Sequence, residues 1–309
     1  MSISASMVKE LREKTNAGML DCKKALEESQ GDFEAAVEWL RKKGLSAAAK
    51  KSGRVAAEGL VSAAVIAGGK IAVVAEVNSE TDFVSRNDEF KVFVQSIIDH
   101  VSTTKATGAI LDQPYQKNTA QTVGDALKTI IAKIGENIVV RRSEKYELQG
   151  DGILHSYVHG EGKIGVLIEV AAPAGALASA DLRTFAQDAA LHIAAMNPMA
   201  ISSEEIPAAV VSKEKEILKA KNLEQGKKPE MIDKIVEGQI RKFLAENCLL
   251  DQAFVKNPDL KVSDYMKETA KKVGGEVKIR RFARYELGEG IEKKTTDFAA
   301  EVAAQTKGH

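Results

Sequence analysis

Three short patterns in this 309-residue sequence could bind a nucleotide, a metal ion or a phosphate group. The segment GEGKIG, residues 160–165, fits the G-x-G-x-x-G pattern of a nucleotide-binding loop. His155 and His159 are four residues apart, which is the spacing of two metal ligands on one helix face. Two arginine pairs, Arg141–Arg142 and Arg280–Arg281, carry charge that could bind phosphate. The meaning of each pattern depends on the element that carries it.

The surrounding sequence argues against catalysis. GEGKIG runs into a predicted strand, whereas a dinucleotide loop opens a helix whose N-terminus holds the pyrophosphate, so we expect a hairpin turn. The two histidines lie on a predicted strand or turn, and no H-E-x-x-H occurs, so we expect surface or packing histidines. No G-x-x-x-x-G-K-[ST] loop and no nucleophile elbow is present. We therefore predict a protein that is not an enzyme, with no catalytic residue, no cofactor and no bound metal.

The arginine pairs are expected at the ends of two strands. Alternation along a strand sends neighbouring side chains to opposite faces, so the two arginines of a pair should separate. Acids follow each pair, Glu144 and Glu147 after the first and Glu286 and Glu289 after the second, and aromatic residues for base stacking are sparse. We therefore expect solvated or ion-paired strand ends rather than a nucleic-acid site.

The segment NSETDFVSRND, residues 78–88, puts an acid and a phenylalanine where turns normally carry small polar residues. It joins a predicted buried strand to a predicted helix, and that helix has a capping box of its own in Ser85 and Asp88. Asp82 and Phe83 are thereby left without a local structural role, and loops on rigid scaffolds often carry function. A second TDF near the C-terminus is expected to open a helix as an ordinary N-cap, so an ordinary cap remains the alternative for the first.

Composition limits the class of protein. The 44 lysines and arginines balance 44 aspartates and glutamates, so no net charge attracts the chain to nucleic acid or to an anionic membrane. Cys22 and Cys248 have no metal or disulfide spacing, which favours a reducing compartment. No secretory signal and no run of about 20 apolar residues is visible. We expect a cytoplasmic protein without a membrane span.

The N-terminal segment predicts three short helices. SMVKELREKT is capped by Ser4 or Ser6, MLDCKKALEES follows it, and Asp32 caps FEAAVEWLRKK, which should end at Gly44. Their apolar residues should form a small core from Val8, Leu11, Leu20, Ala25, Leu26, Phe33, Val37 and Leu40. Such a small module has no room for a catalytic pocket and is typical of a docking domain. The basic stretch LSAAAKKSGRVAAEG then forms a hinge or a frayed helix.

The middle of the chain contains a duplication. GGKIAVVAEV (68–77) aligns with EGKIGVLIEV (161–170) at an offset of 93, and GENIVVRRSEKYEL (135–148) aligns with GGEVKIRRFARYEL (274–287) at an offset of 139. Each copy is predicted to contain a strand, a glycine turn, a second strand, a helix and a last strand that ends in Arg-Arg. The helix of the first copy has one apolar face, formed by Phe90, Phe93, Val94, Ile97, Ile98 and Val101.

Phe93, Gln95 and His100 match Phe185, Gln187 and His192 at an offset of 92. The offset then rises to 139, so the second copy carries about 47 additional residues, from roughly 201 to 249. They predict a helical hairpin on either side of a GKKP turn, with apolar seams at Ile217, Leu218, Ile232, Ile235, Val236, Ile240 and Phe243. We therefore expect an α+β protein. Its parts are a three-helix, UBA-like docking domain and linker (1–54), a first core subdomain (55–150), a second core subdomain (151–200 and 250–290), a helical hairpin or coiled-coil insert (201–249) and a C-terminal helical module (291–309), which contains TTDFAAEVAAQ.

Several of these segments together resemble bacterial elongation factor Ts. They are VKELREKTNAGMLDCKKALEESQGDFEAAVEWLRKKG, the SETDFV turn, KIGENIVVRR and the end GEGIEK…TDFAAEVAA. The resemblance covers essentially the whole chain, including the duplicated core and the helical insert, and leaves only the loop 104–122 unplaced. It implies a guanine-nucleotide exchange factor that binds elongation factor Tu with GDP and promotes GDP release in translation elongation, through protein contacts alone.

The resemblance also implies site residues. The turn formed by Thr81, Asp82, Phe83 and Val84 would enter the partner near its magnesium and nucleotide and displace the ion. Further partner contacts are implied at Arg12, Met19, Leu20 and His159. The N-terminal helices would dock on the nucleotide-binding domain of the partner, and the second subdomain around His159 would dock on another domain.

Two other functions remain open on the sequence. The arginine pairs and the basic stretch 50–54 would suit an RNA-binding translation accessory protein, and the three-helix module would suit a non-catalytic adaptor. Phosphate contacts would make RNA binding fall steeply with salt. Nucleotide release from a bound GTPase would separate the exchange factor from the adaptor. Homodimerisation through the helical insert also remains open, and we predict no direct contact with nucleic acid.

Overall fold

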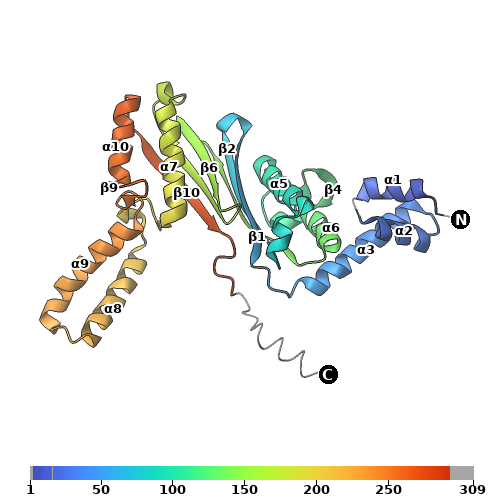
Figure 1. Ribbon diagram of the computed structural model, residues 1–309, viewed down its shortest axis with the longest axis horizontal. Helices are drawn as coiled ribbons and strands as arrows, with labels where there is room; N and C mark the ends of the chain where they lie inside the picture. The colour runs from blue at the N-terminus through green and yellow to red at the C-terminus, as the bar shows by residue number, and fades with distance from the viewer. Residues whose placement is uncertain (1–2, 16, 293–309) are drawn as a thin grey trace. The chain divides into compact units, whose positions relative to one another are not determined.

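The computed structural model describes residues 3–15 and 17–292 (Figure 1). The chain is a mixture of helices and sheets, as predicted for an α+β protein. It divides into two compact units. Unit 1 comprises residues 1–62, 75–143 and the described residues from Glu286 on, and unit 2 comprises residues 63–74 and 144–285. The predicted C-terminal helix, TTDFAAEVAAQ, lies outside the described residues.

The N-terminal segment forms three helices, α1 (Ala5–Thr15), α2 (Met19–Glu28) and α3 (Phe33–Lys51). The predicted caps at Ser4 and Asp32 are confirmed, because their side chains accept the backbone N–H of Met7 at 3.2 Å and of Ala35 at 2.9 Å. The buried core consists of Val8, Leu11, Cys22, Ala25, Leu26 and Ala36. The prediction that Leu20 belongs to this core is wrong, since its side chain is 82% exposed.

Helix α3 does not end at Gly44, as the sequence suggested, but continues for another seven residues to Lys51. The alanine-rich stretch after Gly44 favours helix, because alanine has the highest intrinsic helix propensity. Helix α3 packs against α6 (Val123–Ile134) in the same unit, where Arg41 pairs with Asp125 at 3.3 Å. This packing explains why a glycine in the middle of the helix is tolerated.

The first copy of the duplication forms a three-stranded sheet with the order β1-β2-β5. Its elements are β1 (Glu58–Ile66), β2 (Ile71–Ser79), α4 (Asp82–Ser85), α5 (Asp88–Thr103), β3 (Pro114–Tyr115), β4 (Asn118–Thr122), α6 and β5 (Ile138–Glu147). The predicted apolar face of α5 is buried, as expected. The previously unplaced loop contains the small β3–β4 hairpin, and neither this hairpin nor α6 was predicted from the sequence.

The second copy repeats this design with the sheet order β10-β7-β6. Its elements are β6 (Gly152–His159), β7 (Ile164–Ala171), α7 (Ala180–Met196), β8 (Ala253–Phe254), β9 (Asn257–Lys261), α10 (Val262–Val273) and β10 (Lys278–Glu286). Helix α7 covers β6 and β7, and α10 packs beside α7 (Figure 1). The antiparallel pairing of β6 with β7 brings His159 opposite Ile164. GEGKIG is therefore the predicted hairpin turn, and no helix follows it.

Equivalent positions of the two copies make equivalent contacts. A Cβ atom on Gly59 would lie 2.2 Å from the carbonyl oxygen of Val77, and one on Gly152 would lie 2.4 Å from that of Val170. Only glycine allows the first strand of each copy to approach its neighbour this closely. The same repeat relates two buried histidines, His100 and His192.

The residues added to the second copy form the predicted helical hairpin, α8 (Ala208–Glu224) and α9 (Pro229–Asn247), which lie side by side (Figure 1). Ile232, Val236 and Ile240 are buried between the two helices, with Leu218 packed against them. Ile217 is 52% exposed and lies outside the seam in which it was predicted. A separate cluster around Cys248 joins the base of the hairpin to the rest of unit 2.

Candidate partner-binding site

The turn after β2 is built so that one aromatic side chain points into solvent. Thr81 occupies the N-cap position of the four-residue helix α4, in extended conformation. Phe83 is 77% exposed and Asp82 is also exposed, whereas Val84 is 6% exposed and packs inward. Val84 therefore anchors the turn, and Phe83 is presented by it. An exposed aromatic ring on an ordered turn is typical of a contact residue.

The predicted capping box at Ser85 and Asp88 is wrong. The Ser85 hydroxyl donates to the carbonyl oxygen of Asp82 at 2.6 Å, inside α4. The cap of α5 is Asn87, whose side-chain oxygen accepts the backbone N–H of Glu89 at 2.9 Å and of Phe90 at 3.2 Å. Asn87 in the Ncap position leaves room for α4 before α5. Asn87 caps α5, and the side chains of Asp82 and Phe83 cap neither helix. These two side chains therefore have no capping role, as the sequence indicated.

Two glutamates that belong to no sequence motif form hydrogen bonds at the start of the turn. Glu136 accepts both the backbone N–H and the hydroxyl of Thr81, and Glu80 accepts the backbone N–H of Asn137. Neither residue was predicted from the sequence. The one signal in the sequence is a difference between the two copies, because Gly275 stands where the first copy has Glu136.

The other predicted contact residues are at the surface. Arg12 lies in the last turn of α1, and Met19 (57% exposed) and Leu20 open α2. His159 ends β6 in unit 2, where its exposed ring lies beside Tyr157, with its Nδ1 atom 2.9 Å from the phenol oxygen. The structure thus brings Met19 and Leu20 together as one exposed apolar pair on unit 1. It leaves His159 on the other unit.

Each arginine pair binds one buried glutamate, so the predicted ion pairing is confirmed. Glu76 is fully buried and accepts from Arg141 at 2.9 Å and from Arg142 at 2.6 Å. Glu76 also accepts hydrogen bonds from the backbone N–H of Gly288 at 2.8 Å and from the side-chain amide of Asn78 at 3.0 Å. Burial alone would raise the pKa of Glu76, but these hydrogen bonds together bring the pKa below its usual value.

The second copy repeats this arrangement at Glu169, which accepts from Arg280 at 3.0 Å and from Arg281 at 2.7 Å. The prediction that the two arginines of a pair separate to opposite faces is wrong, because their long side chains bend toward the same carboxylate. The prediction that each pair ends a strand is also wrong, since β5 and β10 continue for five more residues to Glu147 and Glu286.

The buried histidines are held in one tautomer. Nδ1 of His192 accepts the backbone N–H of Val255 at 3.1 Å, so Nε2 carries the proton and donates to Gln252 at 2.9 Å. His100 makes the same pair of contacts with Gln116 and Gln113. Burial lowers the pKa of His192, with the Gln252 hydrogen bond opposing this, and burial also lowers the pKa of His155. These are packing histidines rather than ligands.

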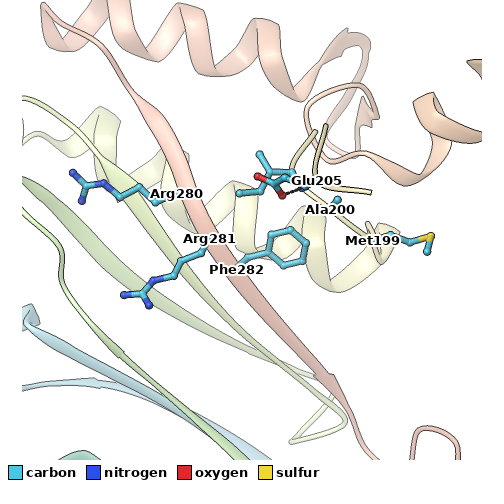
Figure 2. Close-up of a pocket in the computed structure, with 7 residues that line it drawn as sticks. Met199, Ala200, Glu205, Arg280, Arg281 and Phe282 are labelled. Carbon is cyan, nitrogen blue, oxygen red and sulfur yellow. Dashed lines mark hydrogen bonds between the residues drawn. The ribbon is translucent and has the colours of Figure 1, made fainter. Parts of the chain in front are cut away.

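A hollow of about 360 Å³ lies beside β10 in unit 2 (Figure 2). It is lined by Met199, Ala200, Ile201, Glu205, Arg280, Arg281 and Phe282. Figure 2 shows the ring of Phe282 near Glu205, while the guanidinium groups of Arg280 and Arg281 point away from the ring. Glu205 accepts the backbone N–H of Ile201 at 2.9 Å. The charged groups of the hollow are thus committed to internal contacts, and none is poised as an acid, a base or a nucleophile.

The described residues contain neither a metal-binding cluster nor a membrane-spanning helix. Over residues 3–15 and 17–292, no group of three or more histidine, cysteine, aspartate or glutamate side chains is arranged to hold a metal. None of the helices in the described part of the chain is long and apolar enough to cross a bilayer.

Comparison with known proteins decides the family. The family model "Elongation factor TS" matches residues 80–289, and the chain is 65% identical to elongation factor Ts of Bdellovibrio bacteriovorus over the whole of both chains. The chain belongs to the elongation factor Ts family. Other members include elongation factor Ts of Trichlorobacter lovleyi, 47% identical, and of Symbiobacterium thermophilum, 49% identical, each over 98% of both chains. Membership in the elongation factor Ts family places the protein in translation elongation, a step of protein biosynthesis.

Proposed function

We propose that this chain is a guanine-nucleotide exchange factor that binds elongation factor Tu carrying GDP and promotes release of the GDP in the cytoplasm. Membership in the elongation factor Ts family supports the class of partner. The observation that carries the proposal is the side chain of Phe83, 77% exposed on a turn whose next residue, Val84, is buried. The turn presents an apolar ring that unit 1 does not use in its own core.

The chemistry of exchange requires contacts and no bond making. An exchange protein that binds the nucleotide-free partner more tightly than the loaded partner must weaken nucleotide binding by the same ratio, because the coupling between two ligands is reciprocal. Magnesium is the largest local charge at a nucleotide site, so moving its ligands loosens the diphosphate. Phe83 supplies the apolar wedge that moves partner side chains, and Asp82 supplies a carboxylate that competes with them for the ion. No residue of this chain acts as an acid, a base or a nucleophile in this scheme.

Further contacts position the turn on its partner. Met19 and Leu20 form an exposed apolar pair at the start of α2, and Arg12 is exposed on α1. We assign this face to docking on the nucleotide-binding domain of elongation factor Tu. His159, exposed at the end of β6, would contact another domain of the partner. The helical hairpin is a coiled-coil element, and self-association through its exposed apolar residues is a separate proposal that analytical ultracentrifugation would decide.

RNA binding receives less support. The arginine pairs that suggested it are bound to Glu76 and Glu169, and a guanidinium held by a buried carboxylate has fewer donors left for phosphate.

The direct test uses elongation factor Tu loaded with fluorescent GDP. We expect release to accelerate with increasing concentration of this chain and to reach a plateau. We also expect that the chain does not bind RNA. Binding to RNA with an affinity that falls steeply as the salt concentration rises would instead support the RNA-binding alternative. Release at the spontaneous rate at every concentration would contradict the proposal.

A further inference from the structure

Glu136 holds the residue that begins the exposed turn. The backbone N–H of Thr81 donates to Oε2 of Glu136 at 3.0 Å, and the Thr81 hydroxyl donates to Oε1 at 2.7 Å. Glu136 follows Gly135, the left-handed C-cap of α6, and lies two residues before β5 begins. The carboxylate is therefore carried by a short segment that is fixed at both ends. One charged side chain thus fixes both the backbone and the side chain of Thr81.

One further hydrogen bond joins the same two segments, with the donor and the carboxylate exchanged. The carboxylate of Glu80, next to Thr81, accepts the backbone N–H of Asn137, next to Glu136, at 2.5 Å. Asn137 is 4% exposed, and its side chain donates to the carbonyl oxygen of Arg54 at 2.7 Å. The two short segments are thus tied to each other twice. Hydrogen bonds to a charged acceptor are stronger than neutral ones, so this corner is held firmly.

The second copy of the duplication closes the same corner without these ties. Gly275 stands at the position of Glu136, and Pro173 stands at the position of Glu80. A Cβ atom on Gly275 would lie 2.3 Å from Cγ of Pro173, so the two residues are packed directly against each other. The chain then forms a 3-10 turn, Ala174–Ala176, that presents no aromatic ring. The fold can therefore close this corner by apolar contact. The hydrogen bonds from Thr81 to Glu136 and from Asn137 to Glu80, here called the polar clamp, belong to the copy that carries Asp82 and Phe83.

We propose that Glu136 is a positioning residue for nucleotide exchange, which acts by fixing Thr81 and with it the direction in which Asp82 and Phe83 point. This inference rests on the proposed function. Helix α4 has only four residues and cannot hold its own conformation, because isolated helices of this length are unstable. A wedge that must displace partner groups loses effect when it is loosely held, since the ordering then has to occur during exchange. Glu136 keeps the turn ordered before the partner arrives.

Three variants test the proposal in the full chain. Glu136→Ala removes both acceptors. Glu136→Gln keeps two hydrogen bonds, because its amide oxygen can accept the Thr81 N–H while its NH₂ group donates to the hydroxyl. Glu276→Ala is the matched control, since Glu276 lies in the equivalent loop of the second copy, is exposed and pairs only with Lys278 at 2.7 Å in the described residues.

The first readout is the release of fluorescent GDP from elongation factor Tu as a function of factor concentration. We expect Glu136→Ala to lower the plateau rate about tenfold, because the free energy of roughly one hydrogen bond to a charged group no longer orders the turn. The half-saturating concentration should change less than about threefold. We expect Glu136→Gln and Glu276→Ala to stay within about threefold of the unchanged chain. An unchanged plateau for Glu136→Ala would overturn the inference, and so would an equal loss for Glu276→Ala.

The second readout does not depend on the partner. Amide hydrogen exchange at Thr81 reports its hydrogen bond directly, and we expect protection in the unchanged chain and in Glu136→Gln that is lost in Glu136→Ala. Equal exchange at Thr81 in all of these proteins would overturn the inference. If the unchanged chain does not accelerate GDP release from elongation factor Tu, the proposed function is contradicted instead. The experiment thus separates failure of the proposed function from failure of the role of Glu136.

Discussion

Glu169 binds Arg280 and Arg281 in the same way that Glu76, 93 residues earlier, binds Arg141 and Arg142. Both carboxylates are fully buried, and both also accept a backbone N–H, from Gly288 in one case and from Gln149 at 2.9 Å in the other. Gly288 lies two residues after the end of β10, and Gln149 lies two residues after the end of β5. The duplicated glutamate is therefore a structural anchor, and its arginines are not free to bind phosphate.

We expect Glu76→Ala and Glu169→Ala each to destabilise the protein by about 3 kcal/mol, the lower end of the cost of leaving a buried charge unpaired. The arginines are about one-third exposed and can reach water, which lowers the penalty. Urea denaturation followed by circular dichroism measures this. Glu237→Ala is the control, because Glu237 forms an exposed pair with Arg241, and its loss should cost less than about 0.5 kcal/mol. A cost for Glu76→Ala as small as that of the control would contradict the anchor role.

Glu76 should also make stability depend on acid. Its pKa is lowered in the folded protein, so its contribution is present above its ordinary value of 4.5 and is lost as the pH falls through the lower folded pKa. Urea titrations between pH 3 and pH 7 should therefore show a steeper acid loss for the unchanged chain than for Glu76→Gln. Parallel curves would show that the charged form of Glu76 contributes nothing to folding.

His192 predicts a second pH effect of known sign. Its pKa is lowered from 6.5 on folding, so the unfolded chain binds more protons and stability falls as the pH drops below about 6.5. Protonation of Nδ1 would remove the acceptor for the Val255 N–H. We expect His192→Gln to flatten the decline between pH 7 and pH 5, measured by thermal unfolding at fixed ionic strength. His159→Gln is the control, because His159 is exposed, and a curve flattened equally by both variants would contradict this assignment.

The pair Met19 and Leu20 should matter for binding and not for folding. We expect Met19→Ser with Leu20→Ser to change the free energy of unfolding by less than about 0.5 kcal/mol, as at ordinary surface positions. The affinity for nucleotide-free elongation factor Tu, measured by calorimetry, should fall. Leu26→Ala in the same module is the contrasting variant, since Leu26 is fully buried and its truncation should cost about 2–5 kcal/mol. Unchanged affinity in the double variant would remove this face from the docking surface.

The sequence predicted the elements whose pattern is periodic or repeated. The apolar face of α5, the hairpin turn at GEGKIG and the helical insert were all confirmed. Leu20 was assigned both to the core and to the surface, and only the structure separates these, because the helical period around α2 does not show which face is covered. The β3–β4 hairpin was missed, since its strands are short and lack alternation. Helix α6 was missed although its signals are in the sequence, a capping box at Thr122 and Asp125 and apolar residues at helical spacing.

The candidate site was predicted in part for a similar reason. The exposure of Asp82 and Phe83 follows from residue types in a turn, and the structure agrees with it. The clamp at Glu136 joins residues 55 positions apart through one side chain, and no local pattern encodes such a contact. The cap at Asn87 was passed over because Ser85 and Asp88 satisfy the spacing of a capping box equally well.

The decisive measurement for the role of the exposed turn is the rate of GDP release from elongation factor Tu at saturating concentration of the Asp82→Ala, Phe83→Ala variant. Both side chains are exposed, so the variant should unfold within about 0.5 kcal/mol of the unchanged chain. We predict a plateau rate at least about tenfold lower, which corresponds to about 1.4 kcal/mol of lost transition-state stabilisation, with a smaller change in affinity for the nucleotide-free partner. A variant that is folded, saturates the partner and releases GDP at the rate of the unchanged chain would contradict the account.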